Sequence, residues 1–174
     1  VKSHNIKVVR RLTGGGAVFH DLGNLNFTFI ERIIEGEESS AMFRRFTAPI
    51  LEALNAIGVK AYLEGRNDLL IDGRKFSGNA VCIWKERVLQ HGTLLFSAFM
   101  PDVAGALKSR PEKFQGKAVQ SNRSRVTNIS EHLPDGSAIK SVEDFQRYLA
   151  DFICNRAGSV GAEEMIPYKY TEED

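Results

Sequence analysis

The stretch of residues 69–96 constrains the fold most, because it carries hairpin signals. Its first turn is the pair Asp72-Gly73, which lies between the apolar run of residues 69–71 and a strand that resumes at Phe76. An Asp-Gly pair between apolar runs favours a two-residue hairpin turn. We therefore predict that the two flanking strands lie side by side and run in opposite directions.

The same pattern occurs again further along the chain. Residues 81–84 and 88–96 are rich in apolar side chains and are joined by the charged residues 85–87, which predicts a second hairpin. Residues 59–63 read as another short strand, and the alternation in residues 26–29 predicts a half-buried one. Together these segments indicate an antiparallel or mixed sheet.

An amphipathic stretch between the predicted strands at residues 26–29 and 59–63 reads as a helix. Ser39 or Ser40 provides its N-cap, and Gly58 ends it at the C′ position. Pro49 should bend this helix or mark its true start, because proline removes a backbone donor.

A second helix is predicted near the end of the chain. Ser141 caps it, Asp144 follows in the capping-box position, and Gly158 ends it. Helices packed against a hairpin-rich sheet give the α+β class, here a mixed, largely antiparallel sheet flanked by helices.

Composition narrows the class of protein. With 174 residues, of which 43% are hydrophobic, the chain has room for one domain, residues 1–174. A formal net charge of +1 provides no field that favours nucleic acid or an anionic membrane. Cys82 and Cys154 form no metal or redox spacing, and no segment is typical of a signal peptide or a membrane helix. We expect a cytoplasmic protein with no nucleic-acid or membrane partner.

Three consecutive glycines, Gly14, Gly15 and Gly16, form the most unusual local feature, between expected strands at residues 1–9 and 17–20. Glycines at a strand end can present consecutive backbone N–H groups to an anion or a carbonyl. A tight turn without a ligand is the alternative. The preceding pair Arg10-Arg11 can fork onto a phosphate or carboxylate, or form a solvated strand edge.

Two histidines are candidates for the same site. His20 and its neighbour Asp21 would point to opposite faces of a strand, so they are poorly placed to act as an acid–base pair. His20 is therefore interpreted as a ligand-orienting or core group. His91 is equally compatible with a structural and a functional imidazole.

A polar block around the Asp-Gly turn holds the main cationic candidate. Lys75 enters a strand and is followed by the small residues 77–80, which should leave a hollow beside its ammonium group. A solvated surface lysine is the alternative. Asn67 and Asp68 precede the strand, where an Asx-turn is the simpler interpretation. Residues 108–125 carry six cations and few large apolar side chains, which indicates a basic loop.

Three blocks taken together resemble the lipoate–protein ligase family. They are "RRLTGGGAVFHDLGNLNFTF", "GRNDLLIDGRKFSGNA" and "HGTLLF", in that order, within about residues 5 to 130. The resemblance implies a sheet like that of biotin ligases and class II aminoacyl-tRNA synthetases. It also implies activation of lipoate with ATP and Mg²⁺ to lipoyl-AMP, and transfer of the lipoyl group to a lysine of lipoyl carrier domains. Such carriers are the acyltransferase subunits of 2-oxoacid dehydrogenases and the glycine-cleavage H protein.

The resemblance also assigns roles to residues. Lys75 is the catalytic lysine, which touches both carbonyl and phosphate, and Asn67 and Asp68 lie near the nucleotide or its magnesium; no residue is assigned as a metal ligand. The basic residues 108–125 match the family's adenylate-binding loop. The binding residues around the adenylate and the lipoyl chain are Arg11, Thr13, Gly14, Gly15, Gly16, Ala17, Val18, Phe19, His20, Asn24, Ser77, Ala80, His91 and Thr93.

Alternatives to this ligase remain open. An octanoyl or lipoyl transferase of the same superfamily would need a cysteine before the "GRK" strand, where residues 65–68 contain none. Biotin ligase fits the glycine block less well, and an inactive carrier-binding subunit is a further alternative. Family members carry residues ahead of this chain's first residue, and many have a C-terminal accessory domain. We therefore expect a partial catalytic domain, with a second chain as the other way to complete the fold.

Overall fold

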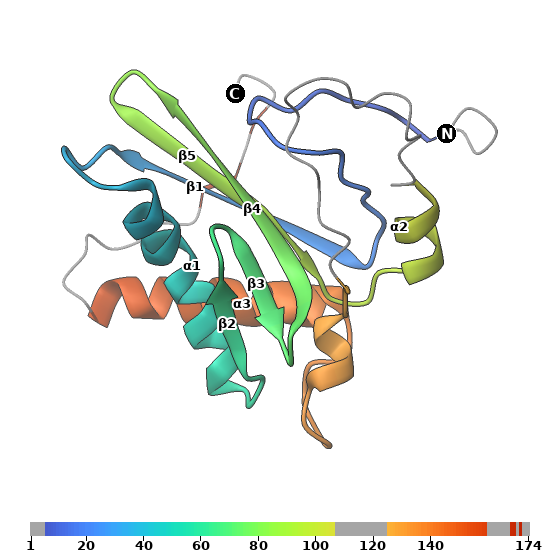
Figure 1. Ribbon diagram of the computed structural model, residues 1–174. Helices are drawn as coiled ribbons and strands as arrows, with labels where there is room; N and C mark the ends of the chain where they lie inside the picture. Colours follow the sequence, from blue (N-terminus) through green and yellow to red (C-terminus); the bar gives the residue numbers. More distant parts are fainter. Residues whose placement is uncertain (1–5, 107–124, 160–167, 170, 172–174) are drawn as a thin grey trace.

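The computed structural model describes residues 6–106, 125–159, 168–169 and 171 of the chain. In this part, five strands form one sheet in the order β1-β5-β4-β3-β2, and all its neighbouring strands are antiparallel (Figure 1). The predicted α+β class with a largely antiparallel sheet is therefore confirmed. The strands are β1 (Asn24–Arg32), β2 (Ala61–Glu64), β3 (Asp68–Ile71), β4 (Arg74–Trp84) and β5 (Arg87–Leu95).

Both predicted hairpins are present. Asp72 and Gly73 join β3 to β4 with φ angles of 49° and 71°, the left-handed pair that an Asp-Gly hairpin turn requires. The second turn joins β4 to β5 and contains Lys85 with a φ of 52°. This turn lies within the charged residues 85–87, as the sequence pattern predicts.

Helix α1 (Ser39–Ala56) agrees with its prediction except at its start. The N-cap is Glu38, which makes no side-chain capping hydrogen bond, so the prediction of a Ser39 or Ser40 cap was wrong. Pro49 lies inside the helix and does not mark its start. Gly58 follows the helix with a φ of 86° and donates its N–H to Asn55, as predicted for the C′ position.

Helix α3 (Val142–Ser159) begins as predicted. Asp144 donates its backbone N–H to Ser141 Oγ, and Ser141 N donates to Asp144 Oδ2, both at 3.1 Å. These two bonds form the reciprocal capping box. The prediction that Gly158 ends the helix was wrong, because α3 extends through Ser159; a single glycine weakens a helix by about 1 kcal/mol without stopping it.

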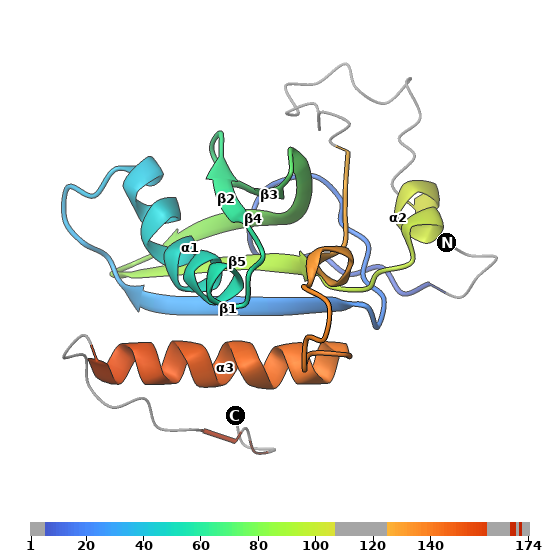
Figure 2. The same cartoon turned by 90° about the horizontal axis from the view of Figure 1, so that it is seen from below.

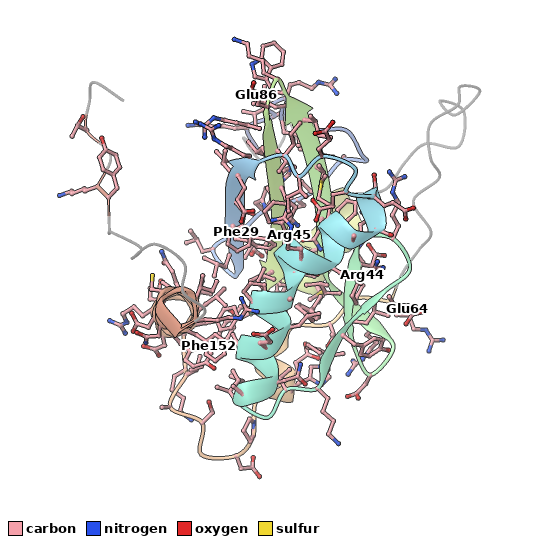
Figure 3. The ribbon with its side chains drawn as sticks, turned by 90° about the vertical axis from the view of Figure 1, so that its left-hand side faces the viewer. Phe29, Arg44, Arg45, Glu64, Glu86 and Phe152 are labelled. Atoms are coloured by element: carbon pink, nitrogen blue, oxygen red, sulfur yellow. The ribbon has the colours of Figure 1, made fainter. Side chains whose placement is uncertain are left out.

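One face of the sheet packs on α1 and α3 and forms the core. Figure 1 shows both helices on the same side of the sheet, and Figure 2 shows α3 beside β1. In Figure 3, Phe152 of α3 is turned toward α1. Phe96 and Phe145 stack with ring centroids 5.1 Å apart. The largest buried cluster contains Ile50, Ala53, Leu54, Val59, Ala61, Leu69, Ile71, Phe76, Leu94, Phe96, Ile129, Ile139, Phe145 and Leu149.

Residues 6–23 form a loop, not the strands predicted at residues 1–9 and 17–20. Residues 1–5 lie outside the described part. Side chains hold the end of this loop: Asn24 Nδ2 donates to Phe19 O, and Asp21 accepts from the N–H groups of Gly23 and Phe99. The glycine run disfavours a strand here, because it offers no side chains for strand packing.

Two short helices were not predicted, α2 (Met100–Ala106) and the 3₁₀ helix η3 (Ile129–His132). Each is too short to show an amphipathic period in the sequence. Among the described residues, no helix has both the length and the apolar character needed to cross a membrane.

Candidate active site

The sheet face away from α1 and α3 carries most of the candidate residues. Thr93 of β5 pairs with Gly78 of β4 and with Asn26 of β1, and directly paired residues lie on the same face. We call it the loop face, because residues 6–23 lie on it. Its residues include Asn26, Thr28, Asp68, Lys75, Gly78, Ala80, His91 and Thr93.

A β-bulge in β4 places Lys75 on this loop face. Leu69 pairs with Ser77 and Leu70 pairs with Lys75, so Phe76 is an extra residue opposite β3. Phe76 and Ser77 are both buried, at 0% and 1% exposure, although they are adjacent in the strand. A bulge allows this break in alternation and redirects the side chains before it.

Ser77 lies on the helix side of the sheet, contrary to its prediction as a pocket residue. It pairs with Leu94, which belongs to the helix-side core. The bulge separates Ser77 from Lys75, and the sequence alone does not show which residue of a strand is the extra one.

The Lys75 ammonium group lies beside a carboxylate and a hollow. Its Nζ is 2.7 Å from Asp68 Oδ1, and the two side chains are 29% and 31% exposed. The hollow has a volume of about 320 Å³ and is lined by Glu64, Gly65, Asp68, Leu70, Gly73, Lys75 and Arg125. A hollow does lie beside Lys75, but the turns around β3 line it, so the prediction that residues 77–80 form it was wrong.

The segment that starts at Arg125 holds the strand of Lys75 from the side opposite β3. Lys75 N donates to Arg125 O at 2.8 Å, and Thr127 N donates to Lys75 O at 3.0 Å. His132 of η3 hydrogen-bonds to Thr127 Oγ1 at 2.9 Å and lies 3.4 Å from Asp72 of the β3–β4 turn. These bonds hold the backbone of Arg125 at the hollow, which this residue lines. The other cations of the predicted basic loop, residues 108–124, lie outside the described residues.

The loop that contains Gly14, Gly15 and Gly16, called the glycine loop below, is organised around Arg11. The guanidinium donates from Nη2 to the carbonyl oxygens of Gly14 and Gly16, each at 2.8 Å, and from Nε to Thr13 Oγ1 at 3.1 Å. Because a trans peptide directs its N–H opposite to its C=O, the N–H groups of Gly15 and Ala17 point away from Arg11. The loop therefore directs two backbone donors away from its own cation.

A contact with His91 attaches this loop to the sheet. Thr13 Oγ1 lies 2.6 Å from His91 Nε2 in a hydrogen bond, and Thr13 is buried. His91 and Thr93 are two residues apart on β5, and Thr93 pairs with Gly78. Residues two apart on one strand face are separated by about 7 Å. The loop and Lys75 thus approach the same face at neighbouring positions, although the glycines do not line the hollow of Lys75.

Both candidate histidines favour the neutral form. Burial lowers the pKa of His91 below its usual value, with Arg11 and His20 as further causes. Burial also lowers the pKa of His20; the charge of Arg11 acts in the same direction, and that of Asp21 opposes it.

These shifts predict that acid weakens the loop contact. A histidine whose pKa is lower in the folded state takes up its proton more readily when unfolded, so stability should fall as the pH drops below about 6.5. We expect a lower thermal unfolding midpoint at pH 5 than at pH 7, with a smaller decrease in the His91→Gln variant. Equal decreases in both proteins would contradict this assignment to His91.

Asn67 is tied into the sheet. Its Nδ2 donates to Asn79 O at 2.6 Å, and its carbonyl oxygen accepts from both N and Nδ2 of Asn79. Gln90, fully buried, donates to Asn79 Oδ1 at 3.0 Å. The sequence did not reveal that Asn79 and Gln90 hold this part of the sheet together. The signal that could have found them is a polar residue at a strand position that faces the core.

The family comparison matches most of the chain. The model of the lipoyl protein ligase A/B catalytic domain matches residues 1–153. Lipoate-protein ligase LplJ of Bacillus subtilis is 47% identical over 174 residues, which is 100% of this chain and 50% of the relative. The chain therefore spans about half the length of the curated relatives it matches.

Solved structures share the fold. A bi-partite lipoate protein ligase from Thermoplasma acidophilum has a TM-score of 0.76 at 28% identity, covering 99% of this chain and 64% of that one. A lipoate-protein ligase A bound with ATP has a TM-score of 0.74 at 23% identity, covering 99% and 66%. Biotin protein ligase from Aquifex aeolicus has a TM-score of 0.51 at 15% identity, covering 80% and 55%, so the expected similarity to biotin ligases is confirmed for the fold.

Proposed function

Because the chain belongs to the lipoyl protein ligase A/B catalytic domain family, we propose that it is the ATP-dependent catalytic part of a lipoate–protein ligase. Residues 1–174 would be one partial catalytic domain. The reaction activates lipoate with ATP to lipoyl-AMP and pyrophosphate and then transfers the lipoyl group to a carrier lysine. The observation that carries the proposal is Lys75, 2.7 Å from Asp68 beside a hollow on the face that also holds the glycine loop.

In the first step a lipoate carboxylate oxygen attacks the α-phosphorus of ATP and pyrophosphate leaves. Negative charge accumulates on the phosphate oxygens, so fixed positive charge stabilises the transition state. Lys75 and Arg125 supply such charge at the hollow. The N–H groups of Gly15 and Ala17, oriented by Arg11, are donors for the adenylate or the acyl carbonyl. Three of the five N–H donors of Arg11 are directed to residues of the loop, so we propose that Arg11 acts through the loop that it orients.

In the second step the carrier amine attacks the acyl carbonyl of lipoyl-AMP and AMP leaves. The carbonyl oxygen becomes negatively charged, and the Lys75 ammonium would stabilise it as it stabilises the phosphate. Thr93, His91 and Ala80 lie on the loop face and would line the acyl chain. The proposed carriers are lipoyl domains of 2-oxoacid dehydrogenases and the glycine-cleavage H protein. The two free cysteines support a cytoplasmic location.

The hollow is compatible with Mg²⁺ held jointly with substrate phosphates. Magnesium in nucleotide sites commonly takes one or two carboxylates together with phosphate oxygens. Asp68 and Glu64 both line the hollow, and the described residues contain no group of three His, Cys, Asp or Glu side chains that could hold a metal by itself. We propose that Asp68 holds the ion, which when bound would neutralise phosphate charge.

Lipoate-dependent exchange of pyrophosphate into ATP tests this function. We expect exchange with the chain, ATP, Mg²⁺ and lipoate, and no exchange when lipoate is omitted. Octanoyl transfer without exchange would instead identify a transferase. Carrier binding without either activity would identify a non-catalytic subunit.

A further inference from the structure

Gly78 lies directly beneath the Lys75 side chain. A Cβ atom at position 78 would be 3.1 Å from Lys75 Nζ and 3.2 Å from its Cε. The end of the lysine side chain therefore rests against the backbone of its own strand. Any side chain at position 78 would push the lysine end away from this position.

The same place is bounded on one side by a carboxylate. Asp68 is the β3 residue that pairs with Gly78, and its Oδ1 is 2.7 Å from Lys75 Nζ. On the other side Gly78 pairs with Thr93 of β5. The ammonium group thus lies over the central residue of one cross-strand row.

The strands at this row are held by a partly buried clamp of hydrogen bonds. Asn67 and Asn79, which neighbour Asp68 and Gly78, are joined by three hydrogen bonds of 2.6, 3.0 and 3.1 Å. Asn79 is 4% exposed and also accepts from Gln90. The clamp fixes the backbone of residue 78 relative to Asp68, so the space above Gly78 has a defined position.

We infer that Gly78 is a positioning residue, whose missing side chain sets where the Lys75 ammonium lies in the adenylation site. This inference rests on the proposed function for its kinetic part. A methyl group at position 78 would require Lys75 Nζ to move by a few tenths of an ångström, away from the place fixed by Asp68. The end of the lysine side chain is flexible, so the fold can accommodate the added methyl group. The ammonium group, however, would no longer lie at the position that the reaction needs.

Gly78→Ala and Gly78→Val test the inference by separating activity from stability. A shift of about 1 Å in a catalytic group can cost 100-fold in rate, so we expect kcat for exchange to fall about tenfold for Gly78→Ala and about 100-fold for Gly78→Val. The KM for lipoate should change little. The unfolding midpoint of Gly78→Ala should not fall, because glycine weakens a strand and this position has no positive φ angle. Cys82→Val, four residues along the same strand, is the matched control and should leave kcat unchanged.

A second measurement does not depend on activity. Limited acetylation with an N-hydroxysuccinimide ester, followed by mass spectrometry, reports the reactivity of each lysine in the folded chain. In Gly78→Ala we expect Lys75 to be acetylated several-fold faster, relative to the exposed Lys60 and Lys85, because its amine is displaced from Asp68.

The two measurements give separable outcomes. Unchanged Lys75 labelling in Gly78→Ala would overturn the inference. So would a fall in kcat that is accompanied by a proportionate fall in the unfolding midpoint. If the unmodified chain shows no lipoate-dependent exchange, the proposed function fails, whereas the labelling still decides whether Gly78 positions the lysine.

Discussion

Replacing Lys75 with alanine should lower the rate of lipoate-dependent ATP–pyrophosphate exchange by a factor of about 100 to 1,000, the usual cost of removing one preorganised electrostatic group. The ammonium faces the hollow together with Asp68 and Arg125, so its loss leaves uncompensated negative charge where phosphate charge develops. The side chain is 29% exposed and contributes little to the core, so the fold should be retained. Initial exchange rates and a thermal unfolding curve of the same preparation measure both effects.

The lysine variant needs a control for general effects of charge removal. Lys60→Ala removes an exposed ammonium just before β2 and should leave the exchange rate unchanged. Asp68→Asn keeps the size of the partner side chain while removing its charge, and should lower the rate with Lys75 still present. An unchanged rate in Lys75→Ala would remove this lysine from the mechanism and, with it, the assignment of the hollow as the adenylation site.

Elements whose signals are local were predictable from the sequence. The Asp72-Gly73 turn and the Ser141–Asp144 capping box each depend on residues within one turn of chain, and both occur as predicted. The N-cap of α1 was predicted incorrectly because two consecutive serines offered a side-chain cap that the helix does not use. A local motif therefore predicts the position of a turn more accurately than the residue at which a helix begins.

Features that depend on distant partners were not predictable. The chain at residues 6–23 forms a loop because Arg11 and His91, 80 positions apart in the sequence, hold it through Thr13. Phe76 is a bulge residue only because of the register of β3. The candidate site follows the same division: the sequence pattern identified Lys75, but not that Arg125 joins it in the hollow or that Ser77 faces the core.

Gly23→Ala should destabilise the protein by about 3 kcal/mol or more, at the upper end of what overpacking costs. A Cβ atom at position 23 would lie 2.3 Å from Ser97 O, 2.4 Å from Ser97 C and 2.5 Å from Ala98 N. These are backbone atoms, which cannot rotate away. Gly23 O also accepts from the N–H groups of Phe96 and Ser97, each at 3.0 Å, so moving the chain apart would break both bonds.

Urea unfolding measures this effect, with Gly14→Ala as the matched control. A Cβ atom at Gly14 would meet nothing within 4 Å, so that variant should differ from the parent protein by less than about 0.5 kcal/mol. Gly23 joins the glycine loop to β1. Its variant should therefore also lose exchange activity at urea concentrations at which the loop has detached and the sheet is still folded. Equal free energies of unfolding for the two alanine variants would mean that the loop can move away from the end of β5 at no cost. A loop held so weakly could not keep the N–H groups of Gly15 and Ala17 in place for a ligand.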